Sequence, residues 1–317
     1  MKRNIWIPIA LAVLLAAPSC KKDEETSTNK PSLYGLDFNL PSFGRVGDTF
    51  VMTPTGVMTS DGKESGHLTY KWKLSGGEYQ ETERFTFTAE EDGSYTVTCL
   101  VLDDDDNYYS STASHTIDII DPTLGNTIAN IGITPREDHF VDPRGDREEE
   151  NTYYYMTAGD LEWMRNNLAW TGAGVPYQMA EVTSYLLGRY YTWDEAMTAC
   201  PDGWRLPTDE EWAVFGDDAG ALMADALFHD KKMWEFWPQV NLTNKSRMSV
   251  IPSGYAIIGP TTPSFNRMSE YAAFWTATES EEDSSMARYR YMNAKTPQVM
   301  MTYGDKKTLA LSVRCVK

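Results

Sequence analysis

Short runs of alternating apolar and polar residues fill the first third of the chain. They occupy residues 49–52, 67–73, 84–88, 95–102 and 115–119. Clusters of glycine, aspartate and serine separate the runs, as is typical of turns between strands. Because side chains alternate between the two faces of a strand, every second residue from Tyr95 to Val101 shares one face, and Trp72 is expected to pack against it. The pattern predicts an all-β sandwich over residues 31–121.

The second half of the chain carries helix signals as well as strands. One short helix is predicted to begin with Asp194 as its N-cap and to turn Ala196 and Met197 inward. It is expected to end at Cys200, because Pro-Asp-Gly follows at residues 201–203. Cys200 is thereby placed at the end of a helix.

A second helix is predicted to follow Thr208, which is expected to cap it. Glu211 stands three residues later, as in a capping box. Residues 209–211 are all acidic, which is favourable beside the positive end of the helix dipole. We therefore assign Glu210 and Glu211 a structural role, the alternative being a catalytic acid and base.

The residues between these halves lose the periodic pattern. Residues 122–150 gain Asp, Gly and Pro, with many charges at residues 142–150. We interpret them as a linker that contains an extended segment at residues 127–133. The length that remains favours two domains, residues 31–121 and 151–317, because single cores rarely grow beyond about 250–300 residues.

The N-terminus has the pattern of a signal peptide at residues 1–19. Lys2 and Arg3 precede an apolar run at residues 5–17, and small residues lead into Cys20. The run is shorter than the roughly 20 residues that a membrane-spanning helix needs. The pattern predicts export of the protein.

The small residues that end in Cys20 resemble the lipobox of bacterial lipoproteins. The resemblance implies acylation of the Cys20 sulfur and anchoring in a membrane. The alternative is an ordinary signal peptide with an incidental cysteine. Residues 20–30 are interpreted as a flexible polar tether. Their acidic residues 23–25 resemble the surface-export signal of Bacteroidota lipoproteins, which implies an outer-membrane protein facing the cell exterior.

The net charge limits the classes of partner, and the cysteine content predicts which thiols are free and which are bridged. The formal charge is −18, which disfavours binding to nucleic acid or to anionic lipid heads through a basic patch. With Cys20 assigned to lipid, an oxidising compartment permits one bridge in the second domain, which holds Cys200 and Cys315. Cys99 is expected to be a buried free thiol.

Motifs for metal, cofactor or nucleophile chemistry are missing. The four aspartates at residues 103–106 suggest calcium, but EF-hand spacing is absent, and we favour a solvated hairpin turn. The four histidines are scattered, without a ligand-spaced pair. No Gly-x-Ser-x-Gly elbow or phosphate-binding glycine loop occurs. We therefore predict a protein without metal, cofactor or catalytic residues.

The sequence EDGSYTV at residues 91–97, with Tyr-Lys-Trp at residues 70–72, resembles the immunoglobulin-like PKD family. The Asp-Phe-Gly-Asp-Gly signature of many members is replaced by Leu-Ser-Gly-Gly at residues 74–77. The resemblance implies an immunoglobulin-like sandwich, a kind of domain that spaces and presents other domains.

Three motifs follow one another in the second half. They are LEWMRNNL at 161–168, the stretch at 188–212 that ends in RLPTDEEW, and FWTATE at 274–279 with SVRC at 312–315. Together they resemble the Fibrobacter succinogenes major paralogous domain over residues 151–317. The resemblance implies an α+β C-type-lectin-like fold, in which a Cys200–Cys315 disulfide joins the first helix to the last strand. Such a bridge closes a loop of over a hundred residues.

Two kinds of protein with related folds, an enzyme family and the calcium-dependent lectins, need residues that this sequence lacks. RLPT at residues 205–208 is also similar to the formylglycine-generating, sulfatase-modifying enzymes. Those enzymes need a pair of reactive cysteines near the C-terminus, whereas Cys315 stands alone with Cys200 as its expected partner. The Glu-Pro-Asn, Gln-Pro-Asp and Trp-Asn-Asp triplets of calcium-dependent lectins are absent too.

The fold that the resemblance implies would place a ligand surface within residues 228–271. The first candidate residues are aromatic or lie beside aromatics: Trp234, Trp237, Phe265, Asn266 and Arg267. Their rings could stack on sugars while the polar side chains donate hydrogen bonds. The alternative is that Trp234 and Trp237 pack one face of a short helix.

A second candidate surface is a strand in which Tyr289 and Tyr291 alternate with Arg288 and Arg290, so that one pair faces out. The leading hypothesis is a non-catalytic surface lipoprotein that binds polysaccharide or mediates adhesion. The alternatives are a structural component that binds a surface protein and, third, an enzyme without recognisable motifs.

Overall fold

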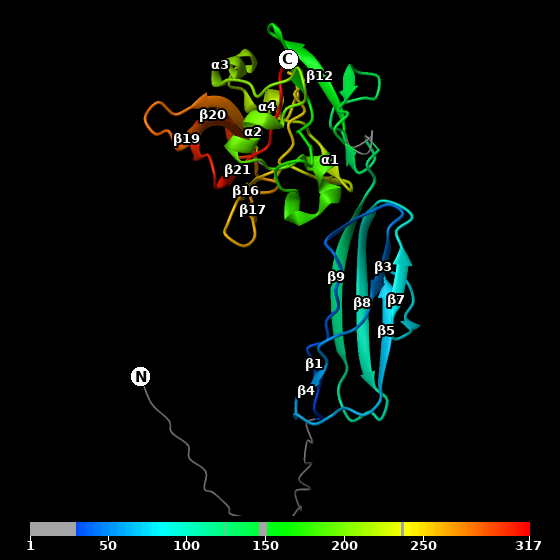
Figure 1. Cartoon of the computed structure of the whole chain (residues 1–317). Helices are drawn as coiled ribbons and strands as arrows, with labels where there is room; N and C mark the ends of the chain where they lie inside the picture. The colour runs from blue at the N-terminus through cyan, green and yellow to red at the C-terminus, as the bar shows by residue number, and fades with distance from the viewer. Residues whose placement is uncertain (1–29, 124, 146–150, 236–237) are drawn as a thin grey trace, which may run out of the picture.

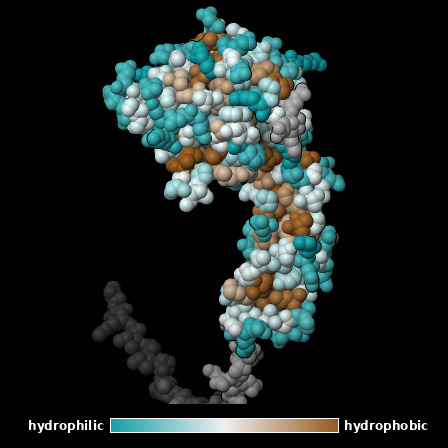
Figure 2. Space-filling model, in the orientation of Figure 1, coloured by the Kyte–Doolittle hydropathy of each residue, from teal (hydrophilic) through white to brown (hydrophobic). Residues whose placement is uncertain are grey.

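The computed structural model describes residues 30–123, 125–145, 151–235 and 238–317. Cys20 and Trp237 lie outside these ranges, so the predictions that rest on them are not addressed by the structure. Strands predominate over helices. Across the described ranges, no helix is both long enough and apolar enough for a membrane crossing. Hydrophilic residues cover most of the visible surface, with scattered apolar patches (Figure 2).

In the N-terminal part, residues 30–121, all the described secondary-structure elements are strands. They are β1 (Leu33–Tyr34), β2 (Phe43–Arg45), β3 (Thr49–Met52), β4 (Met58–Thr59), β5 (Leu68–Leu74), β6 (Gln80–Glu81), β7 (Phe85–Thr88), β8 (Gly93–Asp103) and β9 (Ser111–Ile120). The long strands β5, β8 and β9 lie side by side in a five-stranded sheet of order β2-β9-β8-β5-β6 (Figure 1). A second sheet pairs β3 with β7. The predicted β-structure of this part is confirmed.

The core of the N-terminal part lies between these sheets. Val97, Cys99 and Val101 on β8 are fully buried, and Trp72 lies opposite Cys99 in the ladder. The Trp72 ring stacks on Phe85 with 5.8 Å between ring centroids. Cys99 is a free buried thiol, as predicted, and burial raises its pKa to about 12. The aspartates at residues 103–106 end β8 and form a turn before β9.

The segment interpreted as a linker is in part folded into the C-terminal part. β10 (Ile128–Ala129) pairs with β14 (Leu227–Phe228), and β11 (His139–Val141) pairs with β12 (Thr152–Ala158). Isoleucines of the segment, Ile128, Ile131 and Ile133, are buried in one apolar cluster with residues such as Ile251. The linker interpretation was therefore too broad, because charges and turn residues outnumber these few apolar side chains.

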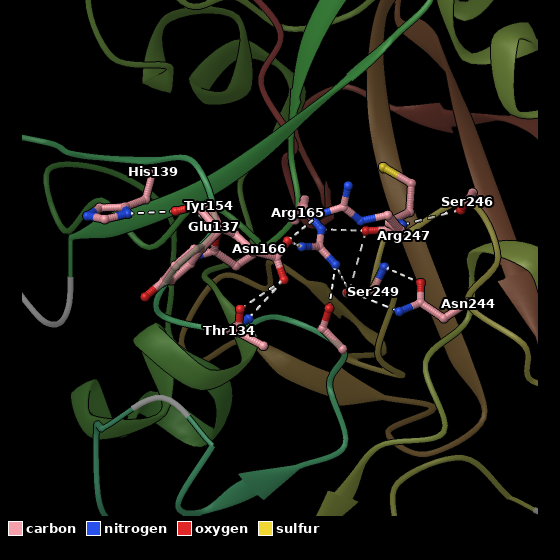
Figure 3. Close-up of polar contacts among 12 residues, drawn as sticks. Thr134, Glu137, His139, Tyr154, Arg165, Asn166, Asn244, Ser246, Arg247 and Ser249 are labelled. Atoms are coloured by element: carbon pink, nitrogen blue, oxygen red, sulfur yellow. Dashed lines mark hydrogen bonds and ion pairs between the residues drawn. The ribbon is translucent and has the colours of Figure 1, made fainter.

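A buried arginine fixes the same segment by polar contacts (Figure 3). The Arg165 side chain has no exposed surface and forms an ion pair with Glu137. It also donates to the carbonyl oxygens of Gly132 (2.6 Å) and Arg247 (2.5 Å) and to Ser249 Oγ (3.0 Å). Arg247 Nη2 approaches Glu137 to 2.5 Å. One carboxylate of the segment therefore meets two guanidinium groups of the C-terminal part.

The C-terminal part combines short helices with strands. The helices are α1 (Ser184–Leu187), α2 (Trp193–Ala199), α3 (Asp209–Trp212) and α4 (Ala219–Leu222), with 3-10 turns at Tyr177–Met179, Glu181–Thr183 and Ala213–Phe215. The further strands are β13 (Leu161–Met164), β15 (Lys231–Lys232), β16 (Tyr255–Ile257), β17 (Ser264–Asn266), β18 (Tyr271–Glu279), β19 (Met286–Asn293), β20 (Thr296–Asp305) and β21 (Leu309–Ala310). They form three-stranded sheets of order β10-β14-β15, β11-β12-β13, β17-β16-β21 and β18-β19-β20.

The first predicted helix begins two residues earlier than expected. The N-cap of α2 is Thr192, whose backbone N–H donates to the Glu195 carboxylate (2.8 Å) in a capping box. Asp194 lies in the first turn instead. Ala196 is buried as predicted, but Met197 is 43% exposed, because the buried side of α2 runs through Trp193, Ala196 and Ala199.

The second predicted helix has the predicted cap. Thr208 Oγ accepts from the Glu211 backbone N–H (3.3 Å), and the Glu211 carboxylate accepts from the Thr208 N–H (2.8 Å). Arg205 also binds Glu211 through both of its terminal nitrogens. Glu211 thus has two structural partners, Thr208 and Arg205, in line with the structural role assigned to it.

The Cys200–Cys315 disulfide is present, with 5.9 Å between the Cα atoms and a sequence separation of 115. Next to it, the Met164 N–H donates to the Cys315 carbonyl (3.0 Å), and the Arg205 N–H donates to the Val316 carbonyl (2.9 Å). The end of the chain therefore lies between β13 and the segment that follows α2.

Candidate functional site

A cleft of about 520 Å³ lies on the C-terminal part, and tyrosines dominate its lining. Tyr255 comes from β16, Tyr271 from β18, and Tyr289 and Tyr291 from β19. The volume falls in the range of about 300–1,000 Å³ that is usual for small-molecule sites. The cleft is therefore large enough for a ligand to contact several of these rings.

Strand register brings the tyrosines together. In the antiparallel pair β18–β19, Ala273 faces Tyr291 and Trp275 faces Tyr289. Side chains two residues apart share a face, so Tyr271 lies on the same face as these pairs. Ala273 is small and fully buried, which leaves the space above it to the neighbouring rings.

The rings form one continuous aromatic surface. Tyr271 stacks on Tyr291 at 4.9 Å between centroids, and Tyr255 meets Tyr271 edge to face at 5.7 Å. Tyr289 lies 5.9 Å from Tyr291. Offset and edge-to-face pairs at these distances stabilise one another, so the surface is held in place before any ligand binds.

Gly304 on β20 leaves room for the neighbouring rings of Trp275 and Tyr289. A Cβ atom at Gly304 would lie 2.4 Å from a methyl carbon of Leu309, 2.9 Å from the Trp275 ring and 3.2 Å from the Tyr289 ring. Real Cβ atoms do not approach other atoms so closely. The absence of a side chain at this position thus allows Trp275 and Tyr289 to pack against the strand.

The hydroxyls of Tyr271 and Tyr289 are neutral at physiological pH. Burial raises the pKa of Tyr271 well above 10, and its interaction with Tyr289 raises it further. Burial also raises the pKa of Tyr289. Neutral hydroxyls can donate as well as accept hydrogen bonds, which suits a ligand that carries hydroxyl groups.

One end of the cleft carries charged side chains. Arg267 Nη1 lies 3.1 Å from a Glu270 carboxylate oxygen, and Lys295 Nζ lies 3.8 Å from the same oxygen. Asn293 lines the cleft beside them and faces Tyr271 in the ladder. The charged end is therefore the Tyr271 end of the aromatic surface.

Of the candidates predicted from sequence, three lie together in the cleft: Arg267, Tyr289 and Tyr291. Phe265 faces elsewhere and packs between Tyr177 (5.4 Å) and Tyr190 (5.8 Å). Asn266 does not line the cleft, and its side-chain amide donates to the Ser264 carbonyl (3.2 Å).

The prediction of Trp234 as a stacking platform is wrong. The residue is only 3% exposed and belongs to an apolar cluster that includes Met248 and Phe274. Its indole N–H points to the Val250 carbonyl at 3.4 Å. Its ring packs in the core and offers no face to a ligand. The packing alternative is correct as to burial, but Trp234 lies in a bend after β15 and not on a helix.

Sequence reasoning missed Tyr255, Tyr271, Asn293 and Lys295. Their signal was weak, because they come from three strands and a turn that only the tertiary structure brings together. Tyr271 could have been predicted, because it is the first residue of the strand whose later residues form the FWTATE motif. As to metals, the described residues include no group of three His, Cys, Asp or Glu side chains arranged to hold an ion.

Two solved structures resemble parts of the chain. The PKD1 domain of Vibrio anguillarum Epp is 20% identical at a TM-score of 0.21, with 28% of this chain and 93% of that chain covered. A structure of carbohydrate-binding modules from the β-sandwich superfamily, described for promiscuous specificity, is 14% identical at a TM-score of 0.26, with 42% and 57% covered. A comparison with curated proteins gave no match.

The family comparison identifies the part of the chain that holds the cleft. The model of the Fibrobacter succinogenes major domain matches residues 156–317, which is just over half of the 317 residues. The match includes the capped helices, both disulfide cysteines and the whole tyrosine cleft. The chain belongs to the family of the Fibrobacter succinogenes major domain.

Proposed function

We propose that this protein is a non-catalytic, surface-anchored protein that binds carbohydrate in the tyrosine cleft. The observation that carries the proposal is the continuous surface of four tyrosine rings that lines the cleft. Aromatic faces pack against the C–H faces of sugar rings, while hydroxyl, amide and charged groups at the edge bind sugar hydroxyls. The cleft supplies both kinds of group.

Within this proposal, the C-terminal part has a C-type-lectin-like fold, and the N-terminal part is a PKD-like domain that spaces it from the membrane. The Cys200–Cys315 bridge supports the first statement, because lectin-like folds join their first helix to their last strand by a disulfide, and this bridge joins the C-cap of the second helix, α2, to the segment after the last strand, β21. The paired sheets and the Trp72 core support the second.

The test of the cleft is glycan binding by the full chain in detergent, first on a glycan array and then by calorimetry with the glycans found. Tyr291→Ala is expected to weaken binding by about tenfold or more, because a central aromatic contact is lost. Tyr291→Phe keeps the ring and is expected to keep most of the affinity.

Tyr303→Ala is the matched control. Tyr303 is also an exposed tyrosine of this sheet, but it pairs with Arg288 and lies on the opposite face. The proposal fails if no glycan binds, or if Tyr303→Ala weakens binding as much as Tyr291→Ala does. Thermal melts of the variants check that each one is folded.

The proposed anchor is a lipid on Cys20, in an outer-membrane protein that faces the cell exterior. The lipobox-like sequence and the acidic residues after it support this part of the proposal. Cys20→Ser is expected to move the protein from the detergent phase to the aqueous phase in a two-phase partition, since acyl chains supply the membrane affinity. Cys99→Ala should stay in the detergent phase. Retention of Cys20→Ser in that phase would contradict a lipid anchor.

A further inference from the structure

We infer that the ligand of the tyrosine cleft is an acidic saccharide, whose carboxylate is bound at the charged end of the cleft by Arg267 and Lys295. The inference rests on the proposed function and narrows it to a class of ligand. It is carried by the charges at the cleft, the conformation of Arg267 and the position of Glu270.

The residues that line the cleft are less acidic than the chain as a whole. The whole sequence has 28 Lys and Arg residues against 46 Asp and Glu residues. The lining of the cleft has two cations, Arg267 and Lys295, against the single carboxylate of Glu270. The carboxylate of Glu235, outside the lining, lies 3.7 Å from Lys295. Because charges beyond about 8 Å are screened at physiological ionic strength, an anionic ligand in the cleft meets mainly these nearby groups.

Arg267 is placed at the cleft by an unfavourable backbone conformation. Its φ angle is 56°, in the left-handed region that is sterically unfavourable for a residue with a side chain. Ser269 has a φ of 68° as well. Strained residues of this kind gather at binding sites, where the surrounding structure holds them in place.

The Arg267 side chain can still bind a ligand. It is 57% exposed, and its ion pair with Glu270 uses Nη1 only. A guanidinium has five N–H donors in a planar fork that matches the two oxygens of a carboxylate. Arg267 can therefore hold Glu270 and a ligand carboxylate together.

The position of Glu270 shows that the charged end of the cleft can hold a carboxylate. Its carboxylate lies between Arg267 and Lys295, at 3.1 and 3.8 Å. This is the environment that a sugar carboxylate would find when its ring lies on Tyr271 and Tyr291. The ring contacts and the carboxylate contact then fall at neighbouring points of one cleft.

The test compares matched acidic and neutral ligands with the full chain in detergent. The probes are galacturonate, mannuronate, glucuronate and sialate oligosaccharides, each paired with its carboxyl-reduced form. At least one acidic probe is expected to bind about tenfold tighter than its reduced form, as befits a charge-assisted hydrogen bond.

Arg267→Gln and Lys295→Gln are each expected to remove most of that preference and to leave binding of the reduced form nearly unchanged. Lys245→Gln is the control, because it removes one exposed positive charge that does not line the cleft. Addition of salt should weaken binding of the acidic probe and leave binding of its reduced form unchanged.

The outcomes separate this inference from the proposed function. If every acidic probe binds no better than its reduced form, or if Arg267→Gln and Lys295→Gln leave the preference intact, the inference is overturned. Binding of neutral glycans that Tyr291→Ala abolishes would then leave the proposed function standing. If no glycan binds at all, the proposed function falls, and the inference falls with it.

Discussion

Replacing Cys200 and Cys315 together by alanine is expected to lower the free energy of unfolding by up to about 4–5 kcal/mol. The bridge closes a loop of 115 residues, and its loss restores the conformational entropy of that loop to the unfolded chain. The same residues hold the end of the chain against β13, so both ends of the C-terminal part should loosen. Urea unfolding followed by tryptophan fluorescence measures the change.

The matched control for this prediction is chemical reduction. Dithiothreitol is expected to lower the unfolding midpoint of the wild-type chain to that of the double variant and to leave the variant unchanged. Equal midpoints for the oxidised wild-type chain and the variant would show that the bridge does not stabilise the fold. The Cys99 thiol is buried in the N-terminal part and does not take part in this comparison.

Glu137→Ala is expected to destabilise the C-terminal part by about 3–5 kcal/mol, the usual cost of removing one partner of a buried ion pair. Arg165 would remain fully buried with its charge uncompensated, and Arg247 would lose the same carboxylate. Glu137→Gln keeps hydrogen-bonding capacity and should cost less. Denaturant unfolding of the variants measures both effects.

Glu162→Ala is the control for this pair. Glu162 lies 3.8 Å from Lys317 in an exposed ion pair, which contributes at most about 1 kcal/mol. If Glu137→Ala costs no more than Glu162→Ala, the buried network does not hold the segment in the way described.

The Glu137 pair also has a defined pH dependence. Burial raises the pKa of Glu137, but Arg247 and Arg165 outweigh burial and hold the pKa below its usual value of 4.5. A lowered pKa in the folded state means that this stability is present above pH 4.5 and is lost as the pH falls through the folded pKa. Glu137→Ala should therefore show a weaker loss of stability with acid than the wild-type chain.

Sequence reasoning succeeded where a pattern is local. The alternation around Val97 gave the buried face of β8, and Thr208 with Glu211 gave the cap of α3. The pairing of Cys200 with Cys315 followed from resemblance rather than from spacing. The first two cases are decided by residues of one strand or one turn, and the third by separate motifs of a known family.

The rest depends on contacts between distant segments. Tyr271 joins Tyr289 through strand pairing, and Tyr255 approaches them from a different sheet; no local pattern contains either relation. Trp234 looks like a ligand platform because aromatic residues cluster around it, yet tertiary packing buries it. The start of α2 was misplaced because Thr192 and Asp194 are both good caps, and the position of Glu195 selects Thr192.

The contact between Glu137 and Arg165 has a practical consequence for dissecting the protein. The family match begins at residue 156, after β10, β11 and Glu137. A fragment cut at that boundary would lose a strand pairing partner and expose a guanidinium that has no water contact in the intact chain. The smallest independently folding piece that contains the cleft is therefore expected to start near residue 122, some thirty positions before the homologous region begins.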